Sequence, residues 1–183
     1  MTQTIRVEQL LRETVSGPYC DLVTRPTGRA VRTSIQRRLT VQHTALALLD
    51  FSEVGLVDFS CADEVIAKLL LEPGCDTAIV LQGLREEQLE AIEHVLEHHD
   101  IAALVHDSEL GTARIVGRAS PDLRTTFFTL QQHGPADTDG VARLTGWPPE
   151  RAADALATLL RLRLILASPA GYRVPLTAEP PTS

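Results

Sequence analysis

The sequence predicts an α/β fold, in which a sheet is covered by helices, followed by a smaller helical part that ends in a hairpin. Apolar runs at residues 44–54, 77–81 and 101–105 have the length and composition of buried strands. Segments with helical spacing of apolar residues alternate with these runs. After residue 122 the helical segments follow one another with no buried strand between them, which indicates a second unit.

The first part contains further elements around these three strands. In residues 60–71 the apolar positions fall on one helical stripe, Ser60 is in place to cap the helix, and Pro73 ends it. The other predicted elements are helices at 27–39 and 85–100, a strand near 5–11 and a strand at 113–116. We expect a mixed sheet with helices packed against it.

In the second part, the sequence pattern predicts three helices followed by two short strands. The helices are expected at residues 123–132, 137–144 and 148–162, and the strands at 164–166 and 172–174 on either side of a turn. The predicted units are therefore residues 1–118 and 119–176. Residues 177–183 are rich in proline and polar side chains, so we expect a disordered tail.

Composition favours a soluble, cytoplasmic protein. The chain is 44% hydrophobic and 22% charged, enough apolar material for a packed core. Its three cysteines have no CxxC spacing, which predicts neither a disulfide framework nor a zinc site. The N-terminal residues are interrupted by charges, unlike a signal peptide, and the longest apolar run is far too short to span a bilayer. No cofactor is expected.

The charge distribution gives no support to nonspecific nucleic-acid binding. Residues 1–119 hold 11 Lys and Arg against 18 Asp and Glu, a net charge of −7, and residues 120–183 hold 6 against 6, a net charge of zero. Proteins that bind nucleic acid through charge alone carry a basic surface. Neither part has one in its composition.

The run LLDFSEVGLVDFSCADEVIAKLLL, residues 48–71, resembles the STAS-like (sulfate-transporter and anti-sigma-antagonist-like) superfamily. The similarity is to domains marked by a DFSxV…SFADE-type sequence, and it extends over about residues 1–117. Residues 27–39 resemble the preceding helix of such domains, with Arg29 in the place of a common basic residue. The resemblance implies a STAS-like α/β domain that binds a protein partner, of kinase-like or anti-sigma type.

The bend from Asp58 to Glu64 is the predicted partner-binding or phosphorylation site. In anti-sigma antagonists the serine directly after the acid is a kinase target; here Phe59 takes that place and Ser60 follows. Ser60 is therefore either a plain N-cap or a modified or partner-contacting residue, and Asp63 and Glu64 suit the positive end of a helix equally well. We expect Arg29 to pair with Asp50 or Asp58 and hold this bend.

Residues 141–174 resemble the winged helix-turn-helix domains of bacterial regulators. If DNA is bound, the third helix enters the major groove with its N-terminal residues, of which only Arg151 is basic. Arg161 and Arg163 lie at its far end, and Arg173 lies on the wing. Two acids near the groove-facing end oppose DNA. The module is thus either a DNA-binding domain or a protein-interaction and dimerisation module.

Other groupings favour structural explanations. His94 and His98 have metal-ligand spacing but fall on a solvated helix face, and no third ligand is evident, so we expect no metal site. Cys61 begins a helix but has the position of a buried apolar residue. The arginines at residues 25, 29, 32, 37 and 38 are either a docking face for an acidic partner or the solvated side of a helix. No catalytic motif is present, so an enzyme is not expected.

The leading hypothesis is a regulatory or signalling adaptor: a STAS-like domain binds a protein partner and is coupled to a winged-helix output module. The alternative is a DNA-binding transcriptional regulator whose α/β domain dimerises or senses a ligand. Partner, operator, ligand and oligomeric state are left open by the sequence.

Overall fold

Five strands form one mixed sheet in the order β1-β2-β3-β4-β5. The computed structural model describes residues 2–109 and 111–176. Strands β1 to β4 are parallel and β5 runs antiparallel to β4. The strands are β1 (Thr2–Arg6), β2 (Leu46–Asp50), β3 (Ala78–Gln82), β4 (Ala102–Asp107) and β5 (Thr112–Gly117). The predicted α/β class is confirmed.

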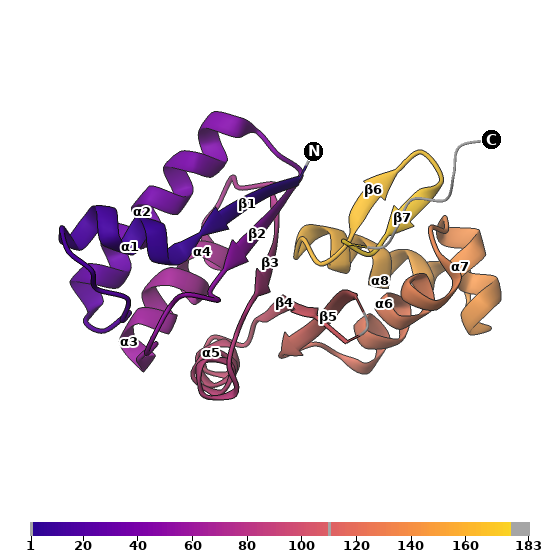
Figure 1. The fold of residues 1–183 in the computed structure, drawn as a ribbon. Helices are drawn as coiled ribbons and strands as arrows, with labels where there is room; N and C mark the ends of the chain where they lie inside the picture. Colours follow the sequence, from indigo (N-terminus) through magenta and orange to yellow (C-terminus); the bar gives the residue numbers. More distant parts are fainter. Residues whose placement is uncertain (1, 110, 177–183) are drawn as a thin grey trace.

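One face of the sheet is covered by the helices that connect the parallel strands (Figure 1). Each parallel strand lies beside the next one in the sequence, and right-handed crossovers then place every connection on the same face. Side chains such as Leu49, Leu81 and Val105 point into this helical core. The helical segments are α1 (Val7–Val15), α2 (Arg25–Gln42), α3 (Phe59–Ala62), the π-helical η1 (Asp63–Ala67), α4 (Lys68–Leu71) and α5 (Glu86–His98).

The opposite face of the sheet packs against the C-terminal elements. Leu46, Val80 and Leu104 alternate with the residues of the first core and join a second cluster with Phe127 and Leu159. This double burial explains why β2, β3 and β4 are almost continuously apolar. The C-terminal elements are α6 (Pro121–His133), α7 (Thr138–Thr145), α8 (Pro149–Arg161), β6 (Leu166–Ser168) and β7 (Gly171–Arg173), the last two forming a hairpin.

Helix α6 also covers the exposed edge of the sheet. Arg124 donates to the carbonyls of Ile115 and Gly117 on β5, at 3.3 and 2.8 Å, and Gln131 donates to Ala113 O at 3.1 Å. An edge strand whose carbonyls are occupied in this way is less available for pairing with another strand. The two parts share one cluster of buried side chains. The division of the chain into two units at residue 118 therefore stays a prediction.

Most sequence-predicted elements are found within a few residues of their expected limits, including the order helix, helix, helix, hairpin at the C-terminal end. The N-terminal strand is the exception, because the chain is helical from Val7 onward and only residues 2–6 are extended. The predicted tail, residues 177–183, lies outside the described residues. Within residues 2–109 and 111–176, we find no helix with both the length and the apolar character of a membrane span.

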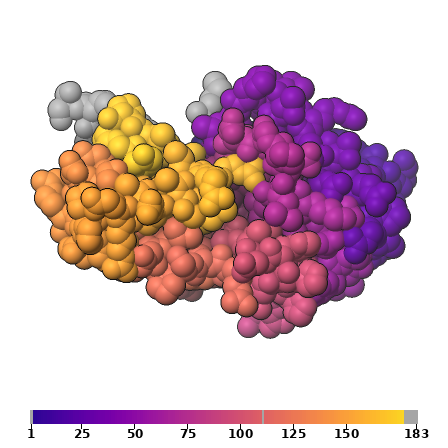
Figure 2. All heavy atoms as spheres, turned by 180° about the vertical axis from the view of Figure 1, so that it is seen from behind, coloured from indigo at the N-terminus to yellow at the C-terminus, as the bar shows by residue number. Residues whose placement is uncertain are grey.

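Arg163, a predicted DNA contact, instead joins the two parts of the chain. Its Nη1 donates to Cys75 O at 2.7 Å and its Nη2 donates to Leu70 O. The segment after α8 lies directly against the segment around α4 and β3 (Figure 2). The residue adopts a left-handed conformation, φ 61°, which costs free energy in a residue other than glycine. The two hydrogen bonds therefore stabilise a strained turn, and they engage the guanidinium that was predicted to contact DNA.

Arg163→Ala should lower the free energy of unfolding by about 2 kcal/mol, because two carbonyls lose a charged donor. Arg161→Ala, two residues earlier on the exposed side of α8, is the matched control and should change stability by less than about 0.5 kcal/mol. Denaturant titration of both variants measures the difference. Equal stabilities would show that Arg163 does not hold the two parts together.

Candidate functional site

The bend before α3 is held by backbone pairing between two loops. Leu22 N donates to Leu56 O at 2.7 Å, and Asp58 N donates to Leu22 O at 3.0 Å, so that Leu22 and Val57 form an isolated parallel bridge. Gly55 N extends the same pairing to Cys20 O. The bend is thereby fixed by the segment that joins α1 to α2.

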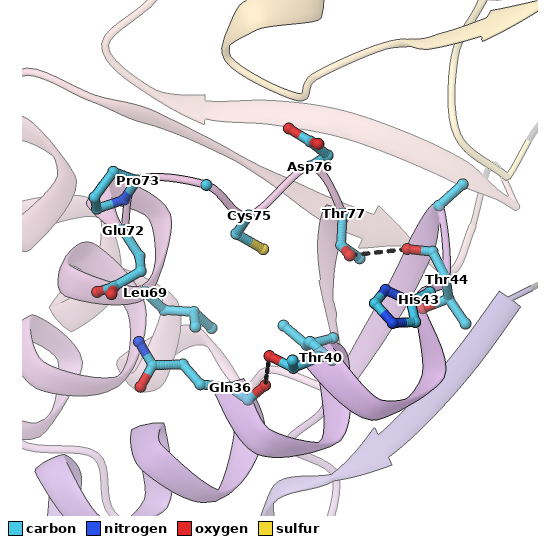
Figure 3. A pocket seen from close by; sticks show the side chains of 13 residues that line it. Gln36, Thr40, His43, Thr44, Leu69, Glu72, Pro73, Cys75, Asp76 and Thr77 are labelled. Carbon is cyan, nitrogen blue, oxygen red and sulfur yellow. Dashed lines mark hydrogen bonds between the residues drawn. The ribbon is translucent and has the colours of Figure 1, made fainter.

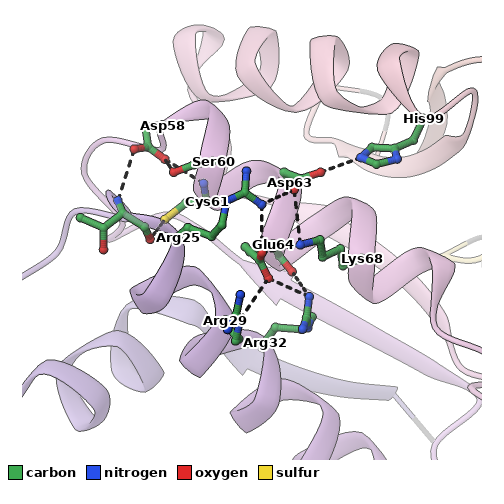
Figure 4. A network of polar contacts seen from close by, with 11 residues as sticks. Arg25, Arg29, Arg32, Asp58, Ser60, Cys61, Asp63, Glu64, Lys68 and His99 are labelled. Carbon is green, nitrogen blue, oxygen red and sulfur yellow. Dashed lines mark hydrogen bonds and ion pairs between the residues drawn. The ribbon is translucent and has the colours of Figure 1, made fainter.

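Asp58, not Ser60, caps the helix that follows (Figure 4). Its Oδ1 accepts hydrogen bonds from Cys61 N at 2.7 Å and from Ser60 Oγ at 2.8 Å, and its Oδ2 accepts one from Thr24 N at 3.3 Å. Burial alone would raise the pKa of Asp58, but these hydrogen bonds outweigh burial and lower the pKa. The carboxylate is thus ionised, and both of its oxygens accept hydrogen bonds that stabilise the bend. The predicted N-cap role of Ser60 is wrong.

Cys61 is buried directly behind this cap. Its thiol donates to Thr24 O at 2.9 Å, and the side chain is 0% exposed. Burial, reinforced by the negative charge of Asp58, raises the pKa of Cys61 to about 12. The thiolate that nucleophilic or redox chemistry needs is therefore strongly disfavoured, and Cys61 behaves as a small core residue.

Asp63 and Glu64 enter a network of cations beneath the bend (Figure 4). Arg25 Nη1 donates to Asp63 Oδ2 at 2.8 Å and to Glu64 Oε1 at 3.0 Å. On the other side, Arg32 Nη1 donates to Glu64 Oε2 at 2.9 Å, while Lys68 Nζ contacts the same carboxylate. These ion pairs connect α2 with η1.

The π-helical geometry of η1 brings two consecutive acids to the same cations. Lys68 N donates to Asp63 O, five residues back, which widens the turn. Asp63 also lies 2.6 Å from Nε2 of His99, the C-cap residue of α5. One short segment therefore connects α2 and α5 through Asp63 and Glu64, and π turns of this kind are frequent where a protein positions functional groups.

The two acids differ in their access to solvent. The side chain of Glu64 is 0% exposed and that of Asp63 is 16% exposed. Glu64 is therefore a buried structural ion-pair partner and cannot contact another protein in this structure. Arg29 lies with its Nε 4.0 Å from Glu64 Oε2, and among the described residues no ion pair joins it to Asp50 or Asp58, so its expected pairing is wrong.

What the bend does present to solvent is apolar. Leu56 is 65% exposed and Phe59 is 46% exposed, on either side of Asp58. Tyr19, 43% exposed, precedes the Cys20 carbonyl that binds Gly55 N. The Phe59 ring stands edge-on to His94, with ring centroids 4.3 Å apart. In the sequence Phe59 stands out only as a departure from a motif, and no local pattern marks Leu56 or Tyr19 as exposed.

The histidines with metal-ligand spacing and the DNA candidates do not assemble into one site among the described residues. Within the described residues no three metal-ligating side chains come together, and His94 instead contacts Phe59. Arg151 forms two hydrogen bonds with Asp122, at 2.8 and 2.7 Å, and lies over the Trp147 ring. The guanidinium of Arg151, the one basic side chain at the start of α8, is therefore already paired with Asp122.

The remaining DNA candidates are dispersed. Arg161 is exposed at the opposite end of α8, ten residues and about 15 Å along the axis from Arg151. Arg173 lines a small cleft of about 250 Å³ together with Arg163 and Leu160. These arginines therefore do not form one continuous basic stripe.

Acid should destabilise the protein through Asp63 and Glu64. Burial alone would raise the pKa of both acids, but hydrogen bonds from His99 and Arg25 to Asp63, and from Lys68 and Arg25 to Glu64, lower both pKa values. Because the pKa values in the folded state lie below those in the unfolded chain, the ionised acids contribute full stability above about pH 5.

This contribution is lost as pH falls below about 4, through the folded-state pKa values. Denaturant titrations between pH 7 and pH 3 should give a free energy of unfolding that falls on acidification. A free energy that stays level or rises in that range would contradict the network.

In comparisons with known proteins, no family model matches the chain and no curated protein does so significantly.

Proposed function

We propose that this chain is a non-enzymatic regulatory adaptor. Its STAS-like α/β part binds a protein partner, of the kinase-like or anti-sigma type that the sequence resemblance implies, through the bend around Asp58. Its C-terminal helices and hairpin serve as a winged helix-turn-helix output module. We name the exposed side chains of Tyr19, Leu56 and Phe59, with Asp58 between the last two, the docking corner.

The exposure of Leu56 and Phe59 carries this proposal. Single exposed apolar residues are common, but here two large ones flank a capped acid, and an exposed tyrosine precedes the residue that pairs with Gly55; we treat the three together as one apolar patch. Aromatic and large apolar side chains supply most of the binding energy at protein interfaces. The patch therefore suits another protein better than a small polar substrate.

The rigidity of the docking corner supports the same proposal. The backbone pairing around Leu22 and the three hydrogen bonds to Asp58 fix the segment before any partner arrives. A surface that is already ordered loses little conformational entropy on binding. The same hydrogen bonds occupy the Asp58 carboxylate, and Cys61 is protonated, so the groups at the corner favour recognition over catalysis.

Ser60 offers a means of regulation at the docking corner. Its hydroxyl donates to Asp58 Oδ1 and is partly exposed. A phosphoryl group on this oxygen would add about two negative charges against an ionised carboxylate and remove the hydrogen bond. Phosphorylation of Ser60 would therefore disrupt the cap and reduce partner binding.

The C-terminal elements support an output module. Asp137 caps α7 by accepting from Gly140 N at 2.8 Å, and Gly146 ends α7 in the left-handed conformation, so that α8 follows after a short turn. The hairpin then returns to the loop before α7 through hydrogen bonds between Ala136 and Tyr172. Because Arg151 is neutralised by Asp122, we favour protein contacts over DNA contacts for this module.

The test replaces the apolar side chains of the docking corner. Full-length Leu56→Ser/Phe59→Ser should recover at least about tenfold less partner from extracts of the native host than the unaltered protein, because loss of interface anchors costs 2 kcal/mol or more. The matched control is Val41→Ser/Leu71→Ser, which alters two exposed apolar residues elsewhere and should leave recovery unchanged.

Ser60→Glu should weaken recovery in the same assay, since it sets a second negative charge beside Asp58. Equal recovery by the corner variant and the control would overturn the proposal. A low-salt shift of DNA by the full chain, abolished by Arg151→Ala/Arg161→Ala, would instead select the DNA-binding alternative.

A further inference from the structure

Cationic side chains outnumber carboxylates in the network around Glu64 (Figure 4). The two carboxylates of Asp63 and Glu64 share, within 4.0 Å, the cationic groups of four side chains: Arg25, Arg29, Arg32 and Lys68. Among residues 2–109 and 111–176, no third carboxylate lies within that distance of any of the four. His99 also contacts Asp63, at 2.6 Å. Four positive charges against two negative ones leave this cluster with an excess of two positive charges.

The start of α2 adds to this excess. Arg25 is the first residue of the helix and Arg29 lies one turn later, and the eighteen residues of α2 include no acid. The N-terminus of a helix is the positive end of its dipole, which negative charge stabilises and positive charge does not. An anion at this end of α2 would therefore offset both the dipole and the excess charge of the side chains.

The cations are accessible to solvent, although the acid beneath them is not. The side chain of Arg29 is 63% exposed, that of Arg25 is 48% and that of Lys68 is 38%, whereas Glu64 is 0% exposed. Glu64 thus holds these cations from below and leaves the outer side of the cluster open to a ligand. Arg32 is only 17% exposed and its Nε is buried without a hydrogen-bond partner, so it contributes charge but no contact.

The other end of α2 offers an anion no comparable cluster. A cavity of about 720 Å³ lies there, and its lining includes Thr40 and His43 (Figure 3). Glu72 and Asp76 also belong to this lining, which among the described residues contains no lysine or arginine. An anion in the cavity would meet His43 as the only side chain that can become cationic. The start of α2 is therefore the end that favours an anion.

We propose that Arg25, Arg29 and Lys68 form a binding site for a dianionic phosphate group. Two negative charges neutralise the excess of the cluster, and guanidinium groups donate strong, charge-assisted hydrogen bonds to phosphate oxygens. Thr24, the residue before Arg25, donates its N–H to Asp58 Oδ2, so the site adjoins the docking corner. The phosphate is carried either by a small molecule or by a phosphorylated side chain of a protein, and both present the same group.

Inorganic phosphate is the first probe, added to the full-length chain near pH 7.5 at constant ionic strength. The Nε–Hε NMR signals of Arg25 and Arg29 should shift saturably up to about 20 mM phosphate, while the backbone amide signal of Thr40 should not shift. Acetate, with one negative charge, should bind at least about threefold more weakly.

O-phosphoserine with blocked termini distinguishes the two sources of phosphate. Tighter binding than that of inorganic phosphate would assign the site to a phosphorylated side chain, and equal or weaker binding would assign it to a small phosphate. Both results support a phosphate site.

Arg29→Gln is the decisive variant. Arg29 is the most exposed of the four cations and lies farthest from its carboxylate, so we expect the fold to be retained. Phosphate binding should weaken at least about fivefold, because a charge-assisted hydrogen bond is lost. Arg37→Gln is the matched control, since it removes an exposed arginine from the same helix and should leave binding unchanged.

No saturable shift with phosphate, or equal phosphate binding by Arg29→Gln and the unaltered protein, would overturn the site. The site does not depend on the proposed function. Leu56→Ser/Phe59→Ser should bind phosphate as the unaltered protein does, so a failure of the phosphate site and a failure of the docking corner are distinguishable.

Discussion

Glu64→Gln should lower the free energy of unfolding by about 3 kcal/mol, the largest effect expected from one polar substitution in this protein. The carboxylate is completely buried and is shared by Arg25, Arg32 and Lys68. Glutamine retains the shape but removes the charge, which leaves cations beneath the docking corner without their counter-ion. Because Arg25 is about half exposed, water compensates part of the loss, and the lower end of the range for buried pairs applies.

Thermal unfolding provides the measurement, with an expected fall in Tm of about 6–12 °C. Glu13→Gln is the matched control, since Glu13 pairs with Arg38 at 3.4 Å while 55% exposed. Exposed pairs contribute little, so the control should change Tm by no more than about 2 °C. Comparable shifts for the two variants would mean that Glu64 does not organise the network.

Gly171→Ala should have an effect of similar size and should detach the hairpin. Gly171 begins β7 with φ 115°, a conformation that side chains rarely adopt. A Cβ there would overlap the backbone of Ala136 and come within 2.6 Å of Asp137 N. Because backbone atoms cannot move aside as a side chain can, we expect a loss of about 3 kcal/mol in the free energy of unfolding.

Gly146→Ala separates crowding from backbone strain. Gly146 also has positive φ, 72°, but a Cβ at this position meets no atom within 4 Å. The control should cost only about 1 kcal/mol. Equal losses in chemical denaturation would show that close packing of the hairpin against the loop before α7 does not contribute.

The spacing of apolar residues predicted most of the fold. Burial on both faces of the sheet makes β2, β3 and β4 almost continuously apolar, which is easy to recognise in the sequence. The strand near residues 5–11 failed for a local reason. Val7, Leu10 and Leu11 have helical spacing and are all buried, but they follow directly on the extended residues 2–6 with no proline or glycine between them. Because no turn residue separates them, β1 and α1 were read as a single strand.

The helix that begins after Asp58 was predicted from the sequence, but its cap was not. Ser60 was expected as the cap, and the carboxylate of Asp58 takes that role. An acid in the first turn of a helix is usually solvated, so the burial of Glu64 had no local signal. Its partner Arg32 lies 32 residues earlier, and the π turn that presents Glu64 depends on packing against α2. Tertiary contacts therefore decided which acid is exposed.

Amide hydrogen–deuterium exchange of the full-length chain, alone and with the captured partner, measures whether the partner binds at the docking corner. We expect slower exchange in residues 55–62 of the complex, because the partner covers Leu56 and Phe59 while the backbone there is already ordered. Slower exchange confined to α7, α8 and the hairpin, with residues 55–62 unchanged, would contradict it.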